Sequence, residues 1–484
     1  MGVRFVSWGM LGLLVASCAA GDAAQGSPRA GGDGGAELAL ASVAARPPGP
    51  WWLATDPVGQ AYPAYGVALH HMANIFEAPA KESRVLGYLR RGARFRASEE
   101  VSREGCAKGW FEVLGGGFVC HGEGVLVDSA PPTYADPPVM SALSDPLPYR
   151  YMKTTNKDVP QFMRMPTPDE EAAVKAAFAG TPVTGDAGVT SLSGLTAQLA
   201  PLVRSRMQPG FYVSVDREVR DEASGRVFLR TVRGGLIRAD ELVDAKQPKG
   251  VGVALGGRLT LPIAFVYRPG APALRLDPIT SELVKAGPDL ANQSAYQLTG
   301  QAVVKGGRRY YVTADGLLLR DSAIRIVDRV PRPKHTGKSE RWIRVDLDRQ
   351  TLTAYDGERP VFATLVASGL NDHATPTGIY RLHTKHVATT MDDMAGDGPY
   401  SIEDVPWTMY FLGGYALHAA FWHDKFGNRR SHGCVNLAPR DARWLFFWSA
   451  SDLPSGWHGV LAKVGKGAVV TLDTGSVYAI ETGS

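Results

Sequence analysis

The chain has 484 residues, of which 44% are hydrophobic and 21% are charged, a balance that allows sizeable cores and excludes a wholly disordered chain. Its formal net charge of +4 is too small over this length to indicate a nucleic-acid partner. The 55 glycines and 33 prolines favour turns and therefore β-rich domains, and the length predicts about three of them, at roughly 150 residues each.

Residues 1–18 are predicted to be an export signal. Arg4 precedes a 13-residue apolar stretch, 5–17, which is too short to span a bilayer as a helix. The stretch ends in Val15-Ala16-Ser17-Cys18, which resembles a lipobox and implies lipid attachment at Cys18. The alternative is an ordinary cleaved signal in which Cys18 is incidental.

Residues 19–50 are dominated by Ala, Gly, Pro and Ser and predict a flexible tether. The residue after Cys18 is Ala19 and not Asp, so in a Gram-negative cell we expect anchoring to the outer membrane, facing the periplasm.

Three cysteines remain beyond the signal. In the oxidising compartment that export implies, an odd number leaves one free thiol. Cys106 and Cys120 are close in sequence and are predicted to form a disulfide, which would contribute ~3 kcal/mol. Cys434 is then left unpaired.

Three later stretches share one pattern: an aromatic residue, a glycine six positions on, and two apolar residues two positions after the glycine. They are 110–119, 228–237 and 310–319. Each predicts a strand, a glycine-containing turn and a second strand, which together form a β-hairpin. Because the copies recur at irregular spacing, they indicate homologous modules with different insertions.

We place these β-modules at 62–128, 146–245 and 250–330. The first resembles a bacterial Src-homology-3-like domain, on Ile75-Phe76-Glu77-Ala78-Pro79 and Gly109-Trp110-Phe111-Glu112-Val113. The other two resemble it more loosely. The resemblance implies small β-barrels that bind cell wall or act as spacers, and plain structural packing is the alternative for the later two.

Within the second module, an Ala-rich run after three acidic residues, 169–171, predicts helices inserted over 166–207.

A Pro- and Lys-rich linker, 331–338, leads to a different pattern. Ile343, Val345 and Leu347 alternate with polar residues and predict a half-buried strand. Further strands are predicted at 361–367 and 379–383, with turns at 356–357 and 375–378. We place this domain at 339–464 and a C-terminal tail at 465–484.

The decisive motif combines His418 with Ser431-His432-Gly433-Cys434, and 12 residues separate His418 from Ser431. A cysteine nucleophile needs a base or cationic partner and a set of donors for the oxyanion. Gly433 lets the backbone pack closely and present N–H groups. Pro439 then begins a predicted helix with an apolar face.

This motif resembles the catalytic domain of the L,D-transpeptidases of bacterial walls. The resemblance covers about 339–464 and departs at Ala419, where the family usually has Gly or Ser, although a backbone carbonyl could still orient His418. It implies a mainly β chain: a sandwich-like catalytic domain with a short helix after Cys434, preceded by the Src-homology-3-like modules.

The resemblance implies a role for each matching residue. Cys434 would be the nucleophile and His418 the base and later the acid. The N–H groups of His432, Gly433 and Cys434 would bind the oxyanion, while Ser431, His432 and Asn436 would shape the site.

Other residues have weaker support. His423 is the runner-up base, with a structural role favoured. Tyr400, Trp407 and Tyr410 are candidate substrate-binding residues, with core packing as the competing interpretation for the last two. His383, His386 and His458 belong to no motif and are expected at the surface or around the site.

The implied reaction is acyl transfer from a peptidoglycan tetrapeptide through a Cys434 thioester, with loss of D-Ala, to an amine acceptor. Water as acceptor would make the enzyme an L,D-carboxypeptidase. We expect no metal or cofactor, no nucleic-acid partner and membrane contact through the lipid. A papain-like hydrolase is disfavoured because its Cys precedes its His. The main rival is a non-catalytic wall-binding lipoprotein.

Overall fold

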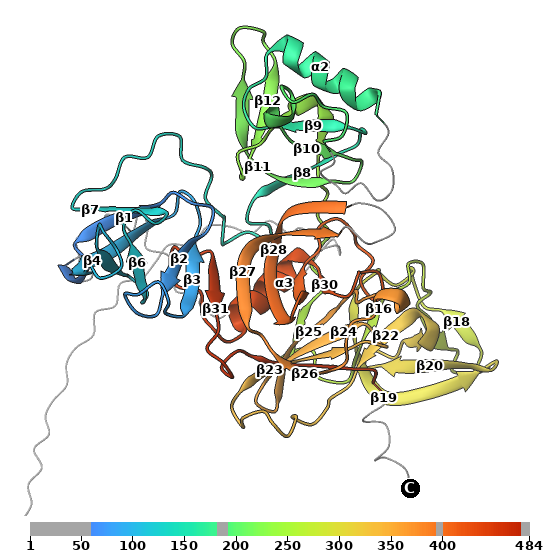
Figure 1. The fold of residues 1–484 in the computed structure, drawn as a ribbon. Coiled ribbons are helices and arrows are strands. Elements are labelled where there is room, and N and C mark those ends of the chain that lie inside the picture. The colour runs from blue at the N-terminus through green and yellow to red at the C-terminus, as the bar shows by residue number, and fades with distance from the viewer. Residues whose placement is uncertain (1–59, 182–191, 394–399, 476–484) are drawn as a thin grey trace, which may run out of the picture. The chain divides into compact units, whose positions relative to one another are not determined.

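The computed structural model describes residues 60–181, 192–393 and 400–475 (Figure 1). The chain is mainly β, as predicted, and the described part has two α-helices, α2 (Pro168–Ala179) and α3 (Pro439–Trp448). No helix in those ranges is long and apolar enough to cross a membrane. The predicted signal and tether, with Cys18, lie outside the described residues.

The first module is a single run of antiparallel strands in the spatial order β7–β1–β4–β5–β6–β2–β3. Its alternating apolar residues form one buried core. Cys106 and Cys120 are joined by a disulfide with a Cα–Cα distance of 5.8 Å, and the bridge packs beside buried Trp110. The strands are β1 (Ala64–Ala68), β2 (Ala73–Phe76), β3 (Val85–Leu89), β4 (Arg94–Ser102), β5 (Trp110–Val113), β6 (Phe118–Cys120) and β7 (Val125–Asp128).

The second module adds the helix α2 to a set of antiparallel strands. The predicted helical insertion is confirmed for α2, but 203–207 form the strand β10, paired with β9. That pairing buries Val203 and Met207, so tertiary contacts decide the conformation there. The strands are β8 (Arg150–Thr154), β9 (Val159–Phe162), β10 (Val203–Met207), β11 (Tyr212–Arg220), β12 (Val227–Thr231), β13 (Leu236–Arg238) and β14 (Leu242–Asp244).

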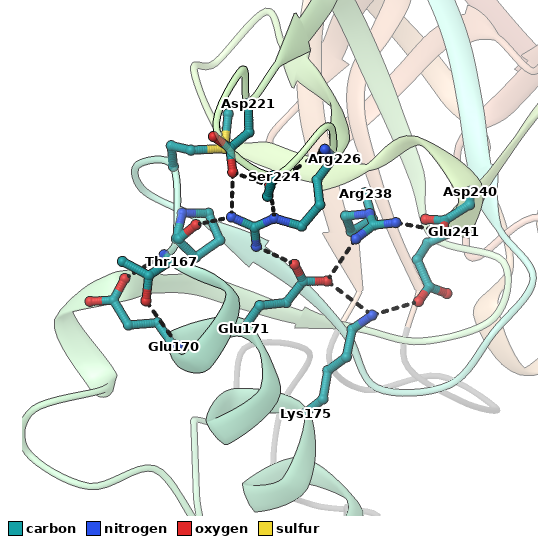
Figure 2. A network of polar contacts seen from close by, with 12 residues as sticks. Thr167, Glu170, Glu171, Lys175, Asp221, Ser224, Arg226, Arg238, Asp240 and Glu241 are labelled. Carbon is teal, nitrogen blue, oxygen red and sulfur yellow. Dashed lines mark hydrogen bonds and ion pairs between the residues drawn. The ribbon is translucent and has the colours of Figure 1, made fainter.

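An ion-pair network holds α2 against this module (Figure 2). Thr167 and Glu170 form a capping box at the start of the helix. One turn further in, the carboxylate of Glu171 accepts from Arg226 at 2.7 Å and also pairs with Arg238 and Lys175. Lys175 lies on α2 itself, whereas Arg226 directly precedes β12 and Arg238 ends β13, so one carboxylate joins the helix to the hairpin.

The third module contains β16 to β22, with β16 between β19 and β22. The short strand β15 lies within the predicted module but pairs with β25 of the last domain. The strands are β15 (Val253–Ala254), β16 (Ile263–Val266), β17 (Leu274–Leu276), β18 (Leu283–Lys285), β19 (Ala295–Lys305), β20 (Arg308–Thr313), β21 (Leu318–Arg320) and β22 (Ile324–Val327).

The three predicted hairpins are confirmed as β5–β6, β12–β13 and β20–β21. Their turns are closed by the same hydrogen bond, from the shared glycine N–H to the carbonyl three residues earlier, at 2.8, 2.8 and 2.9 Å. Gly116, Gly234 and Gly316 all have φ between 81° and 94°, a conformation that disfavours other residues. The sequence repeat is therefore a repeat of one turn geometry.

The last domain consists of two sheets and the helix α3. One sheet has the order β15–β25–β24–β23–β32–β26, and in the other the order is β31–β27–β28–β29–β30. The strands are β23 (Arg341–Asp346), β24 (Thr351–Asp356), β25 (Arg359–Leu365), β26 (Gly378–Arg381), β27 (Thr384–Asp393), β28 (Tyr400–Leu412), β29 (Tyr415–Ala419), β30 (Val435–Leu437), β31 (Gly459–Leu461) and β32 (Val469–Asp473).

Two expectations for this domain need correction. The predicted tail, 465–484, contains β32, which pairs with both β23 and β26 and so completes the first sheet. The strand β23 was expected to expose alternate residues, yet Arg344 and Asp346 are buried. Arg344 pairs with Asp346 and Asp473, so β32 supplies the charge that allows an arginine to be buried there.

Asp404 on β28 connects three parts of the chain. It pairs with Arg90 at 2.7 Å, both side chains being almost fully buried. Ser214 donates to the same carboxylate, and Tyr151 donates to the Asp404 carbonyl. The first module, the second module and the last domain thus meet at one residue. His458 also contacts Arg90, at 2.9 Å, so this histidine is a buried structural group.

Candidate active site

The parallel pair β29 and β30 brings the two halves of the sequence motif together. Its register places His418 opposite Asn436 and Leu417 opposite Val435. Cys434 is the residue immediately before β30, and its Sγ lies 3.7 Å from the Gly414 carbonyl oxygen, at the start of β29. The parallel register therefore places Cys434 two positions before the residue opposite His418.

The loop that presents Cys434 is closed by the Ser431 hydroxyl. Ser431 Oγ donates to the Cys434 carbonyl at 2.5 Å and accepts the Gly433 N–H at 3.1 Å. Gly433 has φ of 119°, and a Cβ there would lie 2.6 Å from the ring of Tyr415. Glycine is therefore required at this position both by conformation and by space.

Thr375 supports the same loop from outside the motif. Its hydroxyl donates to the Gly433 carbonyl at 2.7 Å and accepts the Gly369 N–H at 2.9 Å. The residue is buried, so the bridge is shielded from water. The turn predicted at 375–378 thus contributes a side chain that fixes the cysteine loop.

The orientation of His418 follows from its hydrogen bond. Its Nδ1 lies 3.0 Å from the Ala419 carbonyl oxygen. A carbonyl only accepts, so Nδ1 carries the proton and Nε2 keeps a free lone pair. Ala419 has no polar side chain that could orient the imidazole, and its backbone carbonyl performs this role instead.

Burial keeps both reactive groups uncharged. It raises the pKa of the Cys434 thiol to about 11, with the Ala416 backbone acting in the opposite direction. It also lowers the pKa of His418 to about 4, against the effect of the Ala419 carbonyl. At neutral pH the resting pair is a thiol and a neutral imidazole, and no thiolate–imidazolium pair is formed in advance.

His423 is held by two hydrogen bonds and has no free lone pair for catalysis. Its Nδ1 accepts the Lys425 N–H at 3.2 Å, and burial lowers its pKa to about 3, so Nε2 must carry the proton of the neutral ring. Nε2 faces the Asn436 amide at 3.0 Å. The structure places Asn436 Nδ2 at this position and leaves Asn436 Oδ1 buried without a partner. Since the proton on Nε2 requires an acceptor, we infer the flipped amide, with its oxygen toward His423.

These features are set in a domain with a clear family match. Residues 340–470 match the family model for the L,D-transpeptidase catalytic domain, YkuD. The C-terminal domain is an L,D-transpeptidase catalytic domain. A comparison with curated proteins finds no match.

Several solved structures are similar to part of the chain. A mutant of the Enterococcus faecium L,D-transpeptidase shares 22% identity over 31% of this chain and 55% of that chain, with a TM-score of 0.24. The catalytic domain of an E. faecium L,D-transpeptidase shares 25% identity over 28% of this chain and 98% of that chain, with a TM-score of 0.23. An L,D-transpeptidase from Mycobacterium smegmatis shares 16% identity over 51% of this chain and 90% of that chain, with a TM-score of 0.24. The chain thus spans about half the length of the first of these relatives.

The predicted oxyanion donors of the L,D-transpeptidase domain differ in availability. The Gly433 N–H already donates to Ser431, so this amide serves the loop in the resting structure. The role of the His432 and Cys434 amides stays a prediction. Ser431 donates to the Cys434 carbonyl and the Asn436 amide contacts His423, while the site-shaping role of both residues stays a prediction.

The predicted substrate-binding residues differ in how far they are buried. Trp407 is fully buried, packs on Phe446 and donates its indole N–H to the Pro146 carbonyl at 2.6 Å, so the substrate role predicted for it is wrong. Tyr410 is only partly buried, and burial together with the nearby Cys434 raises its pKa. The side chain of Tyr400 lies outside the described residues.

Sequence reasoning missed two residues beside the cysteine loop of the L,D-transpeptidase domain. The ring of His373 lies 4.9 Å from that of His432 and no motif pointed to it. Thr375 was noticed only as part of a turn. Near Tyr410, His386 contacts the Tyr410 ring and also bonds Tyr88 of the first module, while His383 is exposed.

Proposed function

We propose that the protein is an L,D-transpeptidase that acts on peptidoglycan stem peptides through a Cys434 thioester. The observation that carries the proposal is that a partly exposed thiol at Cys434 directly precedes β30, the strand that pairs with the strand of the oriented imidazole of His418, in a domain that matches this family model. Acyl transfer requires a nucleophile and a base in this relation.

In the first half-reaction, Cys434 Sγ bonds to the carbonyl carbon of the third stem residue as its proton passes to His418 Nε2. The C–N bond to D-Ala then breaks, and His418 returns the proton to the leaving amine. Because burial disfavours both ions, we expect proton transfer to accompany attack and not to precede it. Backbone N–H groups near Cys434 would stabilise the oxyanion.

In the second half-reaction, an amine of a neighbouring stem attacks the thioester carbon. The amine loses a proton to His418, the C–S bond breaks, and the sulfur recovers that proton. A side-chain amine of diaminopimelate has the required chemistry. Water in its place would release a tripeptide, which is the carboxypeptidase alternative.

Acylation by a carbapenem separates an enzyme from a wall-binding lipoprotein. Intact-mass spectrometry of the mature protein should show one adduct, located on Cys434 by peptide mapping. The Cys434→Ala variant should show none while keeping the same circular dichroism spectrum. Absence of an adduct on the folded parent protein would contradict the proposal.

Defined muropeptides distinguish the two enzymatic outcomes. A disaccharide tetrapeptide should yield cross-linked dimers and free D-Ala, both absent with Cys434→Ala. Tripeptide monomers as the sole product would assign the carboxypeptidase reaction instead.

We also propose that lipid on Cys18 anchors the protein to the outer membrane, facing the periplasm. A 32-residue tether at ~5–6 Å × √n has a root-mean-square span of roughly 30 Å, which would confine the domain to wall near that membrane. Cys18→Ser should move the protein to the soluble periplasmic fraction. A parent protein that is already soluble and lacks an acylated N-terminus would refute the anchor.

A further inference from the structure

A cavity lined by both charged and apolar side chains lies where the second module, the first module and the β27–β28 hairpin meet. Its volume is about 780 Å³, within the range of small-molecule sites. The second module contributes Arg204 and Arg233, the first contributes Arg91, and β28 contributes Glu403. This site is not the one built around Cys434.

The arginines of this cavity are only partly neutralised. Arg204 donates to the backbone carbonyl of Arg233 at 2.9 Å, and Arg91 donates to the Tyr134 hydroxyl. Within the described ranges, the half-buried guanidinium of Arg233 has no hydrogen-bond or ion-pair partner. In the part of the chain that the structure describes, the three guanidinium groups form no ion pair, although the charges of Arg204 and Arg233 oppose the rise that burial causes in the pKa of Glu403. A ligand carboxylate would supply the ion-pair partner that they lack.

A buried chain of side chains forms the opposite wall. Ser205 donates to Gln161 at 2.8 Å, and Gln161 donates to Glu403 Oε1 at 3.1 Å. Glu403 is 8% exposed, and its second oxygen, Oε2, is buried with no partner in the described structure. A buried carboxylate oxygen without a donor carries a substantial free-energy cost, which a ligand donor would remove.

We propose that this cavity is a second binding site, for a peptide that carries a free carboxylate. Arg233 and Arg204 hold the carboxylate of the ligand, and Glu403 Oε2 accepts an N–H of the same ligand. The arginine fork matches a planar carboxylate in two-point contact. A phosphate group would satisfy the arginines but would place further negative oxygens against Glu403.

The site is distinct from the one built around the thiol, since Glu403 precedes Tyr410 by seven residues on β28. The two sites are linked by ring contacts, because Tyr212 of the cavity contacts Trp422, whose ring stacks on His418. If the proposed function holds, the wall supplies such a ligand as a stem peptide, and a peptide here would be a different stem from the one at Cys434.

Calorimetric titration of the mature full-length protein carrying Cys434→Ala tests this site without turnover. A disaccharide tetrapeptide at pH 7 should bind at two sites. Arg233→Gln should remove one of them or weaken it at least tenfold, and Glu403→Gln should weaken the same site, since its amide keeps the Gln161 contact but loses the charged acceptor. Arg220→Gln, a matched loss of charge on exposed β11, should change neither site.

Three further measurements identify the ligand. The tetrapeptide with its carboxylates amidated should lose the second site, and inorganic phosphate should not displace the peptide there. Arg233→Gln should melt close to its parent, because the guanidinium makes no hydrogen bond or ion pair in the described structure. One binding event in the parent, unchanged binding in Arg233→Gln and Glu403→Gln, or displacement by phosphate would overturn the proposal. Acylation of Cys434 is measured in a separate experiment, so a failure of the proposed function can be distinguished from a failure of the second binding site.

Discussion

The uncharged state of Cys434 at rest has a direct kinetic consequence. Because burial raises the thiol pKa to about 11, the thiolate fraction should rise about tenfold per pH unit through pH 7–9. We expect the rate of Cys434 alkylation by iodoacetamide to rise with pH over this window, without a plateau. A plateau from about pH 6 upward would indicate a preformed thiolate–imidazolium pair and contradict the structure.

His418 and His423 should differ sharply when replaced. His418 has Nε2 free to take the thiol proton, whereas both nitrogens of His423 are engaged. His418→Ala should slow carbapenem acylation by at least ~100-fold, the usual scale for a lost base. His423→Ala should cost much less. Stopped-flow acylation measures both, and the reverse order would show that the base is misassigned.

The Thr375 hydroxyl bridges Gly369 and Gly433, so it should position the cysteine loop without touching the reacting atoms. Thr375→Val keeps the shape and leaves a buried carbonyl and a buried N–H unpaired, which should lower the acylation rate by roughly tenfold or more. Thr375→Ser should restore most of that rate. Equal rates in all three proteins, with equal melting temperatures, would remove the positioning role.

The reacting residues could be predicted from sequence because their spacing is local to one motif. Trp407 and Thr375 could not. Whether an aromatic residue faces solvent or core depends on α3, which follows 32 positions later, and the partners of Thr375 are brought together only by the fold. When contacts with residues distant in the sequence decide the role of a side chain, the adjacent sequence does not predict that role.

At the scale of elements, the hairpins could be predicted from sequence because their turns depend on local residues. The hairpins around Gly116, Gly234 and Gly316 follow from short-range signals and are present as predicted. β10 and β32 were missed because each is a short strand that depends on partners far along the chain. The buried Arg344 was missed for the same reason, since its partner Asp473 lies on β32.

Glu171 should be the main attachment of α2. Glu171→Gln removes a carboxylate that serves Arg226, Arg238 and Lys175, and we expect a loss of about 1–3 kcal/mol in local stability. Hydrogen exchange of the α2 amides should speed up by roughly tenfold or more. The neighbouring Glu170→Gln affects an exposed cap and should have a smaller effect. Equal exchange in the two variants would contradict the assignment.

At the scale of the whole molecule, the modules are joined through buried polar contacts. Arg90 and Asp404 are 314 positions apart, and Ser214 and Tyr151 come from a third region. No sequence pattern singles out Asp404, because its importance arises only when the three regions meet. Burial opposes its charged form, but Arg90 and Ser214 outweigh burial and hold the pKa of Asp404 below its ordinary value.

Replacement of Asp404 should therefore weaken several modules at once. Asp404→Asn leaves Arg90 buried without its counter-charge, which should cost roughly 3–5 kcal/mol. Hydrogen exchange should increase in β3, β11 and β28 together. Asp216→Asn, which breaks a buried pair with Arg230 inside the second module, should act on that module alone.

The double variant Arg90→Met, Asp404→Asn should recover part of the loss, because no unpaired charge remains. The folded-state pKa of Asp404 lies below its unfolded value. The stabilisation that its carboxylate gives to the folded protein is therefore complete above about pH 4 and declines as the pH falls through the folded pKa. The difference in unfolding midpoint between parent and Asp404→Asn should therefore shrink on acidification below pH 4. A difference that is independent of pH, or exchange confined to β28, would show that Asp404 does not couple the modules.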